Sequence, residues 1–336
     1  MIVKGSGGAG LGDKIRAVIV GAMYCQLTGR SLYVDWRDSA YGDERQNYFP
    51  DLFKIKKLPA LAGLPVSGTV LPHQWSGRLH LSLDEIVQED NFEWSRAGGI
   101  ARYSFDQSQL VHPADHLVMW EMDQFDKVRR HYEISHPEVM VLADEELAAS
   151  VLSQHLQVCD KVQAAVDSFC ETNFTQGQPI IGVHVRLSDE SEGNRRNPGL
   201  AQFIRVVRRA LKGAPAARIF LATDNTNVIK SFMTEFGHSN VLFREKWLPA
   251  AGHALHGNQE CPDKLQNARD ALIDAYLLGK CEWLITSISS SFSMLARVVS
   301  NAPAKNRKLL FPSTPIISRI KNRVSRLVRK TQQQES

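Results

Sequence analysis

The first 36 residues, MIVKGSGGAGLGDKIRAVIVGAMYCQLTGRSLYVDW (residues 1–36), decide the fold class. Residues 1–3 are a short apolar strand, and a glycine-rich loop follows it. Apolar residues from Ile15 to Cys25 then recur at helical spacing, and Gly29 is a typical helix stop. Residues 31–36 have the composition of a buried strand. Strand, loop, helix and strand make a βαβ unit, so the sequence predicts an α/β domain.

The loop contains Gly5, Gly7 and Gly10, which satisfy the pattern G-x-G-x-x-G. This pattern is typical of dinucleotide-binding loops. A glycine loop before a helix can equally admit another phosphate-bearing molecule, because the helix start offers free backbone N–H groups. The motif alone therefore leaves open an NAD-dependent dehydrogenase, which Asp35 would also support.

Length and composition indicate an ordinary globular protein. The chain has 336 residues, 43% of them hydrophobic and 23% charged, which suggests two domains. The net charge is +4, but residues 319–330 carry six basic residues and no acid, so the remainder is near neutral. A near-neutral body argues against a nucleic-acid partner.

The basic segment lies in a predicted tail, residues 313–336, where apolar residues share one stripe. A basic amphipathic helix suits peripheral contact with an anionic membrane surface, and a plain surface tail is the alternative. The five cysteines are widely spaced and odd in number, as expected in a reducing compartment. With no signal peptide or membrane-spanning segment in the sequence, we expect a cytoplasmic protein, with membrane association as the alternative.

The second half of the chain repeats the alternation of strands and helices. We expect residues 90–145 to be irregular and one long helix to cover about 144–173. The turn-rich TQGQP that follows marks a boundary. The predicted domains are 1–173, 174–312 and the tail 313–336. Two α/β halves place a ligand cleft between the carboxyl ends of their strands.

His184 and Arg186 end the apolar run IIGVHVRL (residues 180–187). Because side chains alternate along a strand, both point to the same side. The planar fork of an arginine suits a pyrophosphate, whereas the alternative is a polar strand end that faces water. We favour the binding role, because both residues lie at the carboxyl end of a strand.

Other candidates follow later strands. Asp224 comes directly after IFLAT, and it either anchors a ribose or caps the next helix. Ser289, Ser290 and Ser291 precede a helix, where hydroxyls and backbone N–H groups form an anion site or a simple helix cap.

Asp270 and Asp274 lie four residues apart on one face of a predicted helix. Asp274 lies among apolar residues, so its carboxylate needs a partner. That partner is either the N1–H and N2–H₂ edge of guanine or a structural arginine. The sequence has no metal-binding motif, which predicts a metal-independent mechanism without a cofactor.

Four stretches together carry a resemblance to a known family: GLGDKIRAVIVGAMYCQLTGRSLYVDWRDSAY, GVHVR, IFLATDN and ALIDAYLLGKCEWLITSISSSFSMLAR. In this order they resemble the α1,6-fucosyltransferases, and most closely their nodulation branch, NodZ. The resemblance covers about residues 8–50 and 178–300. It implies a GT-B fold, with two Rossmann-like domains facing across a cleft.

The same resemblance implies a function. By resemblance, the donor is GDP-fucose and the acceptor is a glycan hydroxyl, with an α1,6 linkage expected, in polysaccharide biosynthesis. The resemblance also implies that the transfer inverts the anomeric carbon and that no metal is required. The alternatives that stay open are the dehydrogenase and a non-catalytic protein that binds nucleotide-sugars.

Site residues carry over from the resemblance by motif. Arg186 matches the pyrophosphate arginine, His184 the histidine near the nucleotide, and Asp274 the carboxylate that reads guanine. The phosphate-binding turn corresponds to Ser290 and Ser291, and the glycine loop that approaches the donor to Gly10, Leu11, Gly12 and Asp13.

One segment departs from the family. Relatives usually carry a second basic residue where this chain has Leu187, and the acidic segment beyond it reads SDESEGNRR. Three carboxylates are therefore candidates for the general base without preference: Asp189, Glu190 and Glu192.

Overall fold

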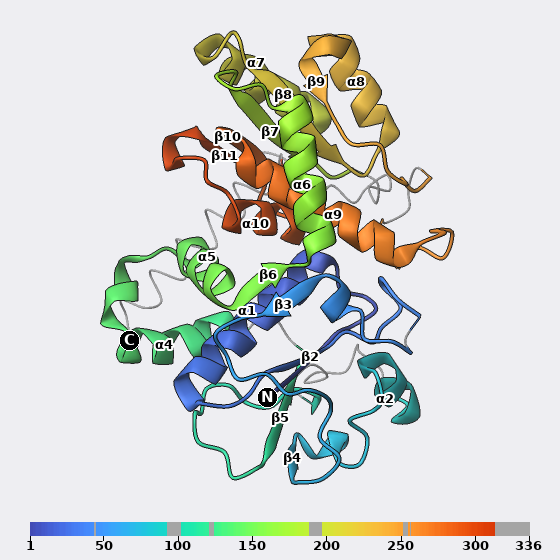
Figure 1. Ribbon diagram of the computed structural model, residues 1–336, viewed down its shortest axis with the longest axis vertical. Coiled ribbons are helices and arrows are strands. Elements are labelled where there is room, and N and C mark those ends of the chain that lie inside the picture. The colour runs from blue at the N-terminus through green and yellow to red at the C-terminus, as the bar shows by residue number, and fades with distance from the viewer. Residues whose placement is uncertain are drawn as a thin grey trace, which may run out of the picture.

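The computed structural model describes residues 1–43, 45–92, 102–120, 124–187, 197–250, 255 and 257–312. Two parallel sheets, one from each half of the chain, are flanked by helices and lie one above the other in Figure 1. This confirms the predicted α/β class.

The sheet of the first half has four parallel strands in the order β2-β1-β5-β4. Its strands are β1 (Ile2–Lys4), β2 (Tyr33–Asp35), β4 (Val70–Leu71) and β5 (His116–Met119). The helices of this half are α1 (Leu11–Thr28), α2 (Leu83–Glu89), α4 (Phe125–Ser135) and α5 (Asp144–His155). The glycine loop leaves the carboxyl end of β1, where the strand order reverses between β1 and β5, and such a switch point is where open α/β sheets bind ligands.

The second sheet has five parallel strands in the order β11-β10-β7-β8-β9. They are β7 (Ile180–Val185), β8 (Arg218–Thr223), β9 (Val241–Leu242), β10 (Trp283–Ser287) and β11 (Arg307–Leu310). Its helices are α7 (Leu200–Gly213), α8 (Thr226–Phe236), α9 (Lys264–Lys280) and α10 (Ser291–Val298). Here the order reverses between β7 and β10, which are the strands that precede Arg186 and the serine run.

Short 3₁₀ turns complete the described structure: η1 (Phe49–Asp51), η2 (His73–Trp75), η3 (Pro137–Val141), η4 (His238–Asn240) and η5 (Ala304–Asn306). The predicted stop of α1 is confirmed, because Gly29 adopts a left-handed φ of 69° and its N–H bonds to the Cys25 carbonyl at 2.8 Å.

The expectation of one helix over 144–173 is wrong. The chain leaves α5 at Leu156, forms β6 (Leu156–Val158), and only then begins α6 (Asp160–Asn173). β6 pairs antiparallel with β3 (Phe53–Ile55). Leu156 and Val158 are buried while Gln157 between them is exposed, so a strand pattern of period two interrupts the helical one.

The expectation of an irregular segment over 90–145 is wrong in part. β5, α4 and the start of α5 lie within it, and β5 sits between β1 and β4. A four-residue strand buried on both faces has no alternation to reveal it, so burial alone places β5 in the sheet.

The two halves share a buried apolar core, which includes Val3 and Ile15 from the first half and Leu272 and Leu295 from the second. Helix α1 packs against α10, and α10 also packs against α5. The division at residue 173 stays a prediction: α6, just before it, contacts α9 of the second half.

Candidate functional site

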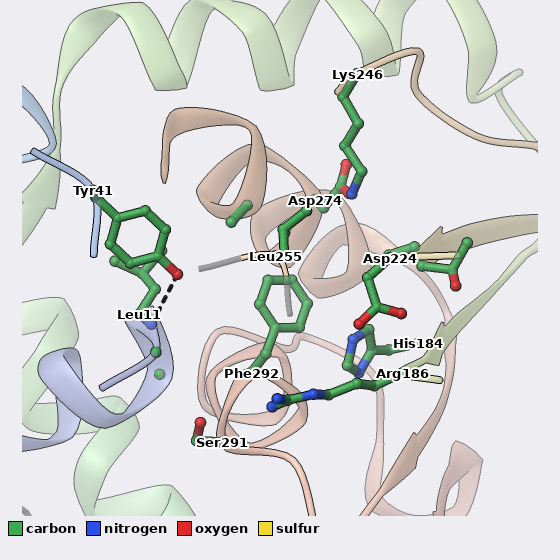
Figure 2. A pocket seen from close by; sticks show the side chains of 15 residues that line it. Leu11, Tyr41, His184, Arg186, Asp224, Lys246, Leu255, Asp274, Ser291 and Phe292 are labelled. Carbon is green, nitrogen blue, oxygen red and sulfur yellow. Dashed lines mark hydrogen bonds and ion pairs between the residues drawn. The ribbon is translucent and has the colours of Figure 1, made fainter. Parts of the chain in front are cut away.

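One cavity lies between the carboxyl ends of the two sheets (Figure 2). We call it the central cavity. It is lined by Gly10, Leu11, Gly12, Tyr41, His184, Arg186, Ala222, Thr223, Asp224, Lys246, Leu255, Ala271, Asp274, Ser291 and Phe292. The predicted residues Gly10, Leu11, Gly12, His184, Arg186, Asp224, Asp274 and Ser291 thus meet at one place.

The start of α1 and the start of α10 touch across this cavity. A Cβ placed on Gly12 would lie 2.2 Å from the backbone oxygen of Ser291, so the approach requires glycine. Beside it, the Asp13 carboxylate accepts a hydrogen bond from Ser291 Oγ at 3.0 Å. Burial raises the pKa of Asp13, although the hydrogen bond from Ser291 and the positive charge of Arg186 both act to lower it.

Arg186 follows β7, and its side chain reaches across the cavity toward the side where Ser291 lies (Figure 2). A guanidinium and the N-terminal end of α10 therefore face the same space, and both favour an anion. Asp224 supports this strand end, because its carboxylate accepts the Leu187 N–H at 3.1 Å. The alternative that Asp224 caps α8 is wrong, since Asn225 is the cap; its ribose role stays a prediction.

His184 is buried beside Arg186. Its Nδ1 lies 2.7 Å from Ser293 Oγ, and its ring lies 4.5 Å from the Phe292 ring, measured between centroids. Burial, together with the positive charges of Arg186 and Lys246, lowers the pKa of His184 to about 3. The imidazole is therefore neutral at pH 7.

Asp274 is paired with cations from the loop after β9. Lys246 Nζ forms an ion pair with Asp274 Oδ2, and Arg244 Nη1 lies 3.4 Å from Asp274 Oδ1. Arg244 also pairs with Asp270 at 2.8 Å. The structural-arginine interpretation of Asp274 is thus present in the structure, and its guanine role stays a prediction.

Three predicted residues face a neighbouring space, which we call the adjacent cavity. Asp13, Ser289 and Ser290 line it together with Arg16, Phe125, Glu145, Met294 and Arg297, among others, and its volume is about 500 Å³. Ser290 is the cap of α10 and accepts the Ser293 N–H at 3.3 Å, whereas the exposed Ser289 donates to Asn197 Oδ1 at 2.8 Å. Ser291 alone among the three serines lines both cavities.

Sequence reasoning missed Tyr41, Lys246, Leu255 and Phe292, which line the central cavity, and the role of Ser293 in orienting His184. The serine run was a signal for Ser293. Lys246 follows a two-residue strand and no periodic pattern marks it.

Several sequence predictions lie outside the described residues. They are the base candidates Asp189, Glu190 and Glu192, and the basic tail over 313–336. None of the described helices has the length and apolarity that a bilayer crossing requires. Within the same described ranges, His, Cys, Asp and Glu side chains form no group of three that could hold a metal ion, and metal independence stays a prediction.

The architecture is that of the GT-B class, two facing α/β domains with a cleft between their strand ends. Residues 2–324 match the family Nodulation protein Z (NodZ), and the chain belongs to that family. The dehydrogenase interpretation is thereby set aside. In agreement, Asp35 is buried in ion pairs with Lys4 at 2.6 Å and Arg37 at 2.7 Å.

The following similar sequence and solved structures are also NodZ proteins. Nodulation protein Z of Bradyrhizobium diazoefficiens is 23% identical over 314 residues, which cover 86% of this chain and 76% of the relative. The crystal structure of fucosyltransferase NodZ from Bradyrhizobium matches with a TM-score of 0.58 and 21% identity, covering 89% of this chain and 93% of that one. A NodZ α1,6-fucosyltransferase soaked with GDP-fucose matches with a TM-score of 0.56 and 22% identity, covering 89% and 92%.

Proposed function

We propose that this member of the NodZ fucosyltransferase family transfers fucose from GDP-fucose to a glycan hydroxyl, in one inverting displacement that needs no metal. The observation that carries the proposal is the meeting of Arg186, the start of α10 at Ser291 and the loop Gly10–Gly12 in one cavity. A guanidinium and a helix start that face the same space suit a diphosphate.

The side chains that line the rest of the central cavity suit a nucleoside. Leu255, Ala271 and Phe292 provide apolar surface for a planar base, and the buried Asp274 carboxylate lines the same cavity. We assign Asp274 to the N1–H and N2–H₂ edge of guanine, and Asp224 to the ribose. His184 is neutral, so it can accept or donate one hydrogen bond near the nucleotide without adding charge.

In the proposed step, the acceptor oxygen attacks C1 of fucose on the face opposite GDP. The new C1–O bond forms as the bond from C1 to the phosphate oxygen breaks, and GDP leaves with that electron pair. Arg186 and the backbone donors at the start of α10 stabilise the charge that develops on the diphosphate. A carboxylate takes the acceptor proton, and we propose Asp189, Glu190 or Glu192 for this role.

We place the acceptor glycan in the adjacent cavity, in an α1,6 linkage. This cavity meets the central one at Ser291, and it combines the aromatic ring of Phe125 with polar side chains such as Arg16 and Glu145. Such a mixture suits sugars, which present both C–H faces and hydroxyls. Two sequence predictions accompany this assignment: a cytoplasmic enzyme, and membrane contact through residues 313–336.

The first test is Arg186→Ala, assayed by GDP release from GDP-fucose in the presence of candidate glycans. Loss of one preorganised charged donor costs about 2.7–4 kcal/mol in the transition state, so turnover should fall about a hundred- to a thousandfold. Arg205→Ala, which removes an exposed arginine on α7, is the control and should leave turnover unchanged. A folded Arg186→Ala variant with normal turnover would contradict the proposal.

The identity of the general base is tested by the single substitutions Asp189→Asn, Glu190→Gln and Glu192→Gln. One of the three should lose nearly all turnover while it still binds GDP. Three mild losses would show that the base lies in another segment.

A further inference from the structure

The loop after β9 supplies two cations to helix α9, and they are held differently. Arg244 is anchored by Asp270, through the carboxylate at 2.8 Å and the backbone oxygen at 3.2 Å. Lys246 pairs with Asp274, and their side chains are only 8% and 3% exposed. Of the two cations, Lys246 is the one that lines the central cavity.

Lys246 and Asp274 form a charged pair at one end of the cavity. Figure 2 shows the Lys246 ammonium beside the Asp274 carboxylate, while Arg186 and Ser291 lie toward the opposite end. Leu255, Phe292 and Ala271 lie nearby in the same lining. If Arg186 and Ser291 hold the diphosphate, the end of the central cavity at Lys246 receives the guanine base.

Guanine presents three polar groups side by side: the donors N2–H₂ and N1–H, and the acceptor O6. A carboxylate can accept from both donors but cannot serve O6. A buried carbonyl oxygen without a donor costs binding energy. Adenine has the opposite pattern at the two corresponding positions, an acceptor at N1 and a donor at N6.

We propose that Lys246 is a specificity-determining residue that donates to guanine O6 while Asp274 accepts from N1–H and N2–H₂. The ion pair places a donor beside two acceptors, as O6 lies beside N1–H. Lysine is an established donor to guanine O6 in nucleic-acid recognition. This inference rests on the proposed function, since it deepens the guanine role of Asp274.

The experiment measures dissociation constants of three nucleoside diphosphates for the wild type and for Lys246→Met. GDP has all three groups, and IDP lacks the 2-amino group but keeps N1–H and O6. The 2-aminopurine riboside diphosphate keeps the amino group but lacks both O6 and the N1–H donor. All three carry the same diphosphate, so differences between them isolate the base. Lys246→Met should weaken GDP and IDP by the same factor, about tenfold or more, and should weaken the 2-aminopurine nucleotide less, because that nucleotide offers no O6 to Lys246.

Two further variants make the test specific. Lys246→Gln keeps a neutral donor and should recover part of the GDP affinity. Lys308→Met removes an exposed lysine on β11 and should change nothing. The thermal unfolding midpoint of each variant shows that it is folded.

Unchanged GDP affinity in Lys246→Met would overturn the inference. Equal weakening of all three ligands would also overturn it, because Lys246 would then act on the diphosphate or on the fold. If the proposed function itself is wrong, the wild type gives a different result. It would not bind GDP more tightly than ADP, or it would release no GDP from GDP-fucose.

Discussion

At the scale of single residues, His184 illustrates how position sets protonation. It lies one residue before the end of the buried strand β7, it is 6% exposed, and the positive charges of Arg186, Lys246 and Arg297 act on it. Burial and these charges both disfavour the imidazolium, so the pKa of His184 falls to about 3. The ring can therefore lie beside Arg186 without repulsion.

This low pKa predicts an acid-side loss of stability. In the unfolded chain His184 titrates near 6.5, and in the folded protein near 3. Between these values the unfolded state binds more protons, so the free energy of unfolding falls as pH falls from about 6.5 toward 3. The wild type should lose more stability than His184→Gln over this range, as measured by urea unfolding at pH 7, 6, 5 and 4. Parallel plots of unfolding free energy against pH for the two proteins would contradict the low pKa of His184, because the contributions of all other titrating groups cancel in the comparison.

At the scale of elements, helix α9 carries the polar end of the central cavity. It presents Asp270 and Asp274 on one face and buries most of its other side chains. Its first turn is held by Asp263, whose carboxylate accepts the Gln266 N–H at 2.8 Å. The cap and the Asp274 carboxylate are thus separate parts of one helix.

We expect Asp263→Ala to lower the free energy of unfolding by about 1 kcal/mol, because it removes a helix cap. Asp263→Asn should restore most of that loss, since asparagine caps equally well. GDP affinity should stay within about twofold of the wild type in both variants, because the cap lies about three turns from Asp274. Chemical denaturation and GDP titration check this. A large loss of GDP affinity in a folded Asp263→Ala variant would instead tie the cap to the site.

At the scale of the whole molecule, the two halves approach each other closely beside the proposed donor site. They touch where Gly12 of α1 meets the backbone of Ser291 and Phe292 at the start of α10. Nearby, Arg297 of α10 forms an ion pair with Glu145 of α5 at 2.6 Å. Because backbone meets backbone at Gly12, no side chain can rotate away to admit a methyl group.

Gly12→Ala should therefore push the halves apart. We expect a loss of about 1–3 kcal/mol in unfolding free energy and weaker binding of GDP. Gly8→Ala is the matched control, because a Cβ at Gly8 meets nothing within 4 Å. Thermal unfolding and GDP titration of the two variants give the comparison. Equal behaviour of the two variants would show that the contact does not position the donor site.

Much of this architecture could be read from the sequence. The βαβ unit at the start and the alternation after residue 180 predict an α/β protein, and β7, β8, β10 and α9 lie where their patterns indicate. Patterns failed where an element was short or buried on both faces. β5 and β6 are such elements, with four and three residues. Their pairing partners, far away in the chain, decide their conformation.

The sequence by itself determined the two α/β halves, the strand ends that carry His184, Arg186 and Asp224, and the helix that carries Asp274, because local periodicity and strand ends are properties of neighbouring residues. Only the tertiary structure decided which of these side chains face one cavity. It separated Asp13 and Ser289 from the central cavity and brought Lys246 to Asp274. The physical reason is that a binding site joins residues from strands far apart in the chain, and the packing of the two halves sets their distances.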